Sequence, residues 1–179
     1  VQWYGDYVDQ GLVDAMVDQG VCELTGLSDP MAAWQRIMSS YQPGDKVAIK
    51  VNFNNCKDYN DSDNQIDAIV EPINSIISGL NRIGVPDTDI WVYDASRTLP
   101  NRFTSGCLYP GVKFFDFQGQ NGNQKAAFES ADPSGTVDFS NALINQHLIT
   151  DVLINAKHLI SVPHRGSPRC SPRPPWAGR

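Results

Sequence analysis

The hydrophobic and polar positions of this chain follow two different periods. Residues 7–25 and 65–84 carry apolar side chains three or four positions apart, which is the spacing of one face of an α-helix. Residues 46–53, 90–96 and 112–117 are short and rich in Val, Ile, Phe and Tyr, as buried strands are. The pattern therefore predicts strands that alternate with helices.

The N-terminal third predicts two helices. In the first, over residues 7–25, six apolar side chains are expected to share one buried face: Val8, Leu12, Val13, Met16, Val17 and Val21. In the second, over residues 29–40, Asp29 is the expected N-cap and Pro30 suits the first turn, where a missing N–H costs no helical hydrogen bond.

The most regular helical pattern spans residues 65–84. Pro72 should either kink this helix or set its start, because proline cannot donate a helical hydrogen bond. Gly84 is expected as the C-terminal cap. Ser62 and Gln65 have the spacing of a capping box.

Strand, helix and strand in this order predict an α/β fold, in which a mainly parallel, Rossmann-like sheet has flanking helices. In the first strand Val47, Ile49 and Val51 should face one side and Ala48 the other. Residues 151–160 read as a further strand, and residues 137–150 fit neither period clearly.

Ligands of open α/β sheets bind outside the carboxyl ends of the strands, and polar residues follow three of the predicted strands. The candidate site residues are Lys50, Asn52, Asn54, Asp94, Ser96, Arg97, Asn155 and Lys157. Lys50 and Arg97 would supply positive charge. Asp94 would be a general base or a metal ligand, with Lys50 as a second candidate catalytic group.

Each of these residues also has a structural interpretation. Asparagines favour turns, Asp94 can cap the turn after its strand, and Lys50 alternates with apolar neighbours and can simply face solvent. Residues 60–71 follow the calcium-loop pattern poorly, because Gln65 stands where that loop needs glycine. The prediction of a site therefore depends on the clusters taken together.

Charge divides the chain unevenly. All 20 acidic residues precede residue 152, whereas Arg165, Arg169, Arg173 and Arg179 lie near the C-terminus. Residues 1–163 therefore carry a net charge of −10. Nucleic-acid binding is not expected of such a body, because phosphate contacts need clustered Lys and Arg. Only the basic tail offers that alternative.

The remaining composition narrows the class of protein. The four cysteines, Cys22, Cys56, Cys107 and Cys170, form no C-x-x-C pair, so no iron–sulfur or zinc motif is present. No apolar run reaches the length of a membrane helix, and a soluble protein without membrane contact is expected. The compartment, cytoplasmic or exported, and the cofactor stay open.

Three segments in this order resemble a known family. GDKVAIKVNFNN, IWVYDASR and TDVLINAKHLI are similar to motifs of the bacterial and archaeal family called domain of unknown function 362, over residues of about 40–160. The resemblance places the family's polar positions on Lys50, Asn52, Asp94, Ser96 and Asn155, with Lys157 near the family's lysine. It implies no settled reaction. Some members carry iron–sulfur modules, for which this chain lacks clustered cysteines.

The C-terminus departs from the family. Residues 164–179 are rich in Arg, Pro, Gly and Ser, where the family continues with more α/β structure. We expect one domain over residues 1–163, the N-terminal part of a larger family domain, followed by a tail that a frameshift would produce. A genuine basic tail is the alternative. A sheet that ends here would expose an unpaired edge and favour self-association.

Two functions follow as hypotheses. The first is binding of a small anionic or metal-linked ligand at the carboxyl ends of the strands. The second is a non-catalytic interaction module, accessory to a redox or exported complex. Neither the reaction nor the substrate follows from the sequence, and whether the chain is an enzyme stays open.

Overall fold

The computed structural model of the chain describes residues 7–53, 56, 59–60, 67–128, 135–141 and 144–163. Its helices are α1 Gln10–Thr25, α2 Pro30–Ile37, α3 Glu71–Arg82, the 3-10 helix η2 Asp87–Asp89, α4 Asn101–Ser105 and α5 Asp151–Asn155. Its strands are β1 Val47–Lys50, β2 Ile90–Asp94, β3 Lys113–Asp116, β4 Gln124–Lys125, β5 Thr136–Asn141, β6 Ile144–Leu148 and β7 His158–Ser161.

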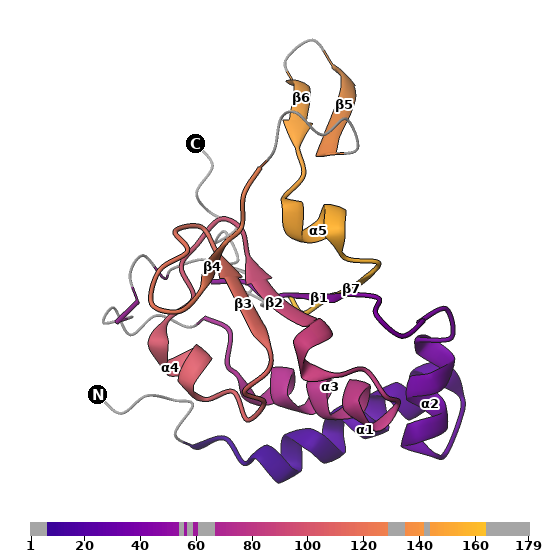
Figure 1. Cartoon of the computed structure of the whole chain (residues 1–179). Helices are drawn as coiled ribbons and strands as arrows, with labels where there is room; N and C mark the ends of the chain where they lie inside the picture. The colour runs from indigo at the N-terminus through magenta and orange to yellow at the C-terminus, as the bar shows by residue number, and fades with distance from the viewer. Residues whose placement is uncertain are drawn as a thin grey trace, which may run out of the picture.

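Five strands form one parallel sheet in the order β4-β3-β2-β1-β7. Helix α3 connects β1 to β2, and α4 lies between β2 and β3, so the strands and helices alternate as in Rossmann-like folds (Figure 1). The predicted α/β class and parallel sheet are confirmed.

One face of the sheet packs against the helical layer. Val47, Ile49 and Val51 are fully buried on this face, and they share a core with Ile77 and Leu80 of α3. Ala48 belongs to a separate core cluster on the other face. The two-sided pattern predicted for the first strand is therefore confirmed. Figure 1 shows α1, α2 and α3 together on one side of the sheet.

The predicted helix ends in this layer are largely confirmed. The Asp29 carboxylate accepts a hydrogen bond from the Ala32 N–H at the start of α2. Pro72 sets the start of α3 and does not kink it, since it lies in the first turn. Gly84 follows α3 with a φ of 92°, and its N–H donates to the Asn81 carbonyl. The capping box of Ser62 and Gln65 lies outside the described residues.

The predicted single apolar face of residues 7–25 is wrong at two positions. Leu12 and Met16 are 64% and 65% exposed, although Val17 and Val21 pack against the core. The reason is that α1 turns polar groups as well as valines toward α3. Asp14, for example, lies on that inner side and accepts a hydrogen bond from Ser75 Oγ. Apolar residues of α1 therefore lie on both its inner and its outer side.

The other face of the sheet has a lighter cover. Tyr93 and Phe115 pack there with Val152 of α5, which is a helix of five residues. Strands β5 and β6 pair as an antiparallel hairpin, which Figure 1 shows projecting away from the sheet. The segment that the sequence left ambiguous thus forms this hairpin.

Residues 151–160 do not form one strand, and this correction moves two candidate residues. Residues 151–155 form α5, and β7 begins only at His158, whose N–H donates to the Lys46 carbonyl next to β1. Because β7 is parallel to β1, Asn155 and Lys157, which come just before β7, lie toward the amino edge of the sheet. On its other side β7 has no partner strand within the described part of the chain. Self-association through this edge stays a prediction.

No helix in the described ranges is both long and apolar enough to cross a membrane. The tail over residues 164–179, including the question of whether it is genuine, lies outside the described residues.

Candidate ligand site at the carboxyl edge of the sheet

The structure brings five of the eight predicted residues to one edge of the sheet. Lys50 is the last residue of β1, and Asn52 follows that strand. Asp94 is the last residue of the neighbouring strand β2, which Ser96 and Arg97 follow. Asn54 lies outside the described residues.

Asn155 and Lys157 are not part of this edge. Asn155 ends α5, and its side-chain nitrogen donates to the Asp151 carbonyl within the same helix. Lys157 Nζ lies 3.3 Å from Asp45 Oδ2, before the start of β1. Their predicted position after the last strand is therefore wrong, because the strand begins later than the apolar pattern suggested.

Asp94 organises the two loops that follow β1 and β2. It is only 4% exposed. Its Oδ2 accepts the Phe53 N–H at 2.9 Å, and its Oδ1 accepts the Ser96 N–H at 2.9 Å and the Ser96 hydroxyl at 2.8 Å. Both carboxylate oxygens are thus engaged by the chain itself, as expected of a structural aspartate at a turn.

Lys50 and Asn52 lie on the opposite face of the sheet from Asp94. Side chains alternate along a strand, so Lys50 shares the face of Ala48, whereas Asp94 shares the face of Val92. Lys50 Nζ donates to Asn52 Oδ1 at 2.6 Å. This bond turns the donor end of the Asn52 amide away from Lys50. The assignment of Lys50 and Asp94 as catalytic groups stays a prediction.

Tyr93 adds a polar group to the Lys50 face. It is the partner of Lys50 in the register of β1 and β2, which places both side chains on one side. Burial, followed by the charge of Asp94, raises the pKa of Tyr93 to about 12. The phenol therefore keeps its proton at neutral pH and has a hydrogen to donate.

Asp116 is a site residue that sequence reasoning missed. It pairs with Asp94 in the register of β2 and β3 and is completely buried. Five donors reach its two oxygens: the Gln118, Gly119 and Leu99 N–H groups, the Asn123 amide and the Tyr59 hydroxyl. The available signal was the repeated pattern of an aspartate that ends a strand, in IWVYD and again in KFFD.

Tyr59 connects this carboxylate to the loop after β1. Its hydroxyl donates to Asp116 Oδ1 at 3.3 Å and accepts the Gln120 N–H at 3.1 Å. Burial is the main cause that raises the pKa of Tyr59, and the charge of Asp116 raises it further. The phenol therefore stays protonated, as its role as donor requires.

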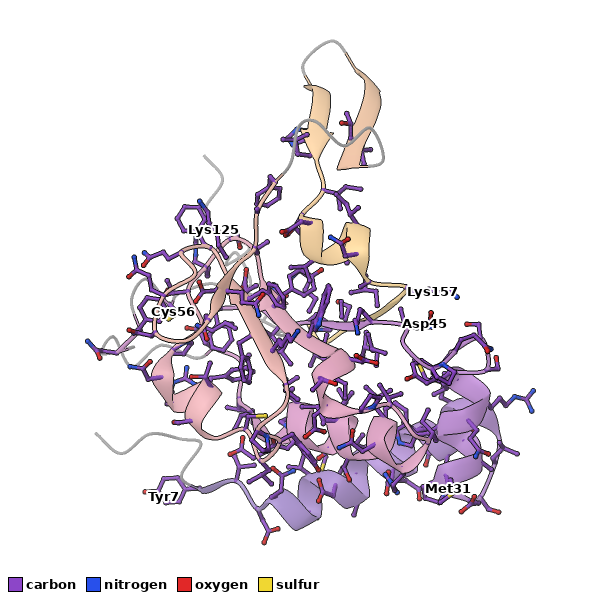
Figure 2. The ribbon with its side chains drawn as sticks, viewed as in Figure 1. Tyr7, Met31, Asp45, Cys56, Lys125 and Lys157 are labelled. Carbon is purple, nitrogen blue, oxygen red and sulfur yellow. The ribbon has the colours of Figure 1, made fainter. Side chains whose placement is uncertain are left out.

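Among the residues of this edge that the structure describes, the accessible charged side chains are positive. In the described segments that end and follow β1 to β4, the acidic residues are Asp67, Asp94 and Asp116, and all three are buried. Arg97 and Lys125 are exposed and Lys50 is half-buried. Strands β1 and β4 are three spacings apart, roughly 14 Å. Figure 2 labels Lys125 on the side of the molecule where Cys56 also lies.

The described residues hold no group of three or more His, Cys, Asp or Glu side chains that could bind a metal ion.

No protein-family model, no curated protein and no solved structure matches this chain. The resemblance to the domain of unknown function 362 family stays a prediction.

Proposed function

We propose that this chain binds a small anion, such as a phosphate ester or a polycarboxylate, at the carboxyl edge of its sheet. One observation carries this proposal: among the described residues, the carboxylates that end β2 and β3, Asp94 and Asp116, are buried and engaged, whereas Lys50, Arg97 and Lys125 reach solvent. In an acidic protein, positively charged side chains that are grouped on neighbouring strand ends attract anions. Parallel sheets bind their ligands at this edge.

The side chains have different tasks in this proposal. Lys50 and Arg97 supply charge, and the Asn52 amide supplies a hydrogen-bond donor. Asp94 positions the ligand-binding loops by holding Ser96 and the Phe53 N–H, and does not touch the ligand. The proposed function is binding, without an assigned reaction.

A second candidate is a non-catalytic interaction module. The observation that favours it is the light cover of the sheet face opposite the main helical layer, where α5 contributes one buried side chain, Val152. A protein of this kind would show no stabilisation by small anions.

Titration calorimetry with phosphate, pyrophosphate, citrate and ADP, each with and without Mg²⁺, tests the binding proposal. We expect at least one of these anions to bind. Lys50→Ala and Arg97→Ala should each weaken that binding roughly ten- to a hundredfold, the equivalent of one hydrogen bond to a charged group.

Lys113→Ala is the matched control, because Lys113 is exposed but begins β3 at the amino edge of the sheet. The Lys113→Ala variant should bind the anion with the same affinity as the unchanged protein. Equal weakening by Lys113→Ala would mean that only the overall charge matters. If none of the four anions binds, the interaction module becomes the better candidate.

A further inference from the structure

Large exposed apolar side chains concentrate in residues 7–37, the segment that contains α1 and α2. In the described part of the chain these side chains are Tyr7, Leu12, Met16, Leu24, Met31, Ile37, Leu108, Phe117, Phe128 and Leu159. Six of them lie within residues 7–37. Figure 1 shows α1 at the outer margin of the helical layer, and Figure 2 labels Tyr7 and Met31 along that margin.

Four residues of α1 form a ridge on its outer side. Leu12, Met16, Gly20 and Leu24 follow one another at intervals of four, which makes a continuous row on a helix surface. Leu12, Met16 and Leu24 are 64%, 65% and 78% exposed. Gly20 is a notch in this row, because a Cβ built there meets no atom within 4 Å.

The ridge itself carries no charge. Asp14 and Asp18 of α1 lie on the inner side, where they bond to Ser75 and Arg82 of α3. The exposed Glu23 lies beside the ridge and accepts a hydrogen bond from Gln19. The ridge thus exposes apolar side chains in an otherwise acidic chain of net charge −6. Exposed apolar surface is unfavourable in water, and a partner that covers the ridge would remove it from water.

Two copies of this ridge fit each other when their helices run antiparallel. An antiparallel pair of α1 helices, related by a twofold axis near residue 18, places Met16 at Gly20 of the second copy and Leu12 at Leu24. Methionine is a flexible side chain that fills such gaps well. Rows spaced by four interdigitate at a crossing angle of about −50°, and a glycine at the crossing permits close approach. Twofold dimers use the same patch on both copies.

We propose that the outer ridge of α1 (Leu12, Met16, Gly20 and Leu24) is a homodimer interface, occupied by the same ridge of a second copy. The proposal is independent of the anion site at the sheet edge. A contact through one helix pair is small, below about 1,200 Å², so the dimer is weak and depends on concentration. Because both copies are acidic, salt should strengthen it by screening their repulsion.

Sedimentation equilibrium of the full chain from about 1 to about 300 µM, at low and at about 0.5 M salt, tests this proposal. We expect a monomer–dimer equilibrium that shifts toward dimer at high salt. Met16→Glu and Gly20→Leu should each weaken dimerisation by about tenfold or more. Gly20→Leu fills the notch but favours the helix, so its melting temperature should rise and exclude misfolding as the cause.

Two control variants alter exposed positions outside the ridge. Ala15→Leu adds bulk elsewhere on α1, and Leu108→Glu places a charge on another exposed leucine. Both should dimerise as the unchanged chain does. A monomer at every concentration and salt overturns the proposal. So does a dimer that persists in both ridge variants, or one that Leu159→Glu on the edge strand β7 dissociates instead.

Discussion

At the scale of single residues, the buried aspartates at the edge of this sheet have a structural role, and the charged side chains that reach solvent there are lysines and an arginine. An aspartate at the end of a parallel strand suggests a catalytic or metal-binding role, and the sequence predicts such a role for Asp94 for that reason. The structure gives Asp94 and Asp116 another task, since backbone and side-chain donors of the surrounding loops engage all four of their oxygens. The lysines and the arginine of the same edge carry the functional proposal.

The substitution Asp116→Asn tests this structural role. One oxygen would become an amide nitrogen that faces N–H donors, so at least two of the five donors would lose their acceptor. We expect the free energy of unfolding to fall by about 2–4 kcal/mol, measured by urea denaturation. The exposed Glu23→Gln change should stay within about 0.5 kcal/mol. If Asp116→Asn lowers the free energy of unfolding as little as Glu23→Gln does, Asp116 does not hold the loops together.

At the scale of elements, two glycines in helices have opposite roles. Gly79 of α3 lies directly against the buried Trp34 ring, and a Cβ at this position would stand 2.2 Å from Trp34 Cε2. Gly20 of α1 faces open space. The sequence shows both as helical glycines, and only the packing distinguishes them.

Gly79→Ala and Gly20→Ala therefore form a matched pair of substitutions. Alanine favours a helix over glycine by about 1 kcal/mol at either position. Gly20→Ala should gain this stability. Gly79→Ala should instead lower the free energy of unfolding by about 1–3 kcal/mol, because the methyl group overpacks the α2–α3 contact. Thermal and urea denaturation at low protein concentration measure both, and a stabilised Gly79→Ala variant would contradict the packing of Trp34.

At the scale of the whole molecule, Asp45 connects the start of β1 to the last strand. The Gln42 N–H donates to Asp45 Oδ2 at 2.8 Å, and His158 Nε2 lies 3.3 Å from the same oxygen. The hydrogen bond from Gln42 is the main cause that lowers the pKa of Asp45, and His158 and Lys157 lower it further. The folded chain therefore holds this carboxyl ionised more strongly than the unfolded chain does.

This shift predicts a specific acid dependence. Stabilisation from a carboxyl with a lowered pKa is complete above the unfolded value, about 3.9, and disappears as the pH falls through the folded value. Asp45→Asn should therefore unfold more easily at pH 7 but lose less stability than the unchanged chain between about pH 4 and pH 2. Urea denaturation across this range measures the difference. Parallel curves for both proteins would show that Asp45 does not link β1 to β7.

The sequence by itself determined the α/β class, the two-sided burial of β1, the caps of α2 and α3, and the presence of Lys50, Asn52, Asp94, Ser96 and Arg97 at one edge. These features are local, because apolar period, capping residues and strand ends are properties of neighbouring residues. Only the tertiary structure decided that Asn155 and Lys157 lie at the opposite edge, that Leu12 and Met16 face outward, and that Asp116 organises the loops. Those outcomes depend on where β7 meets β1, which side of α1 meets α3, and which donors converge from distant segments, and no local pattern encodes such contacts.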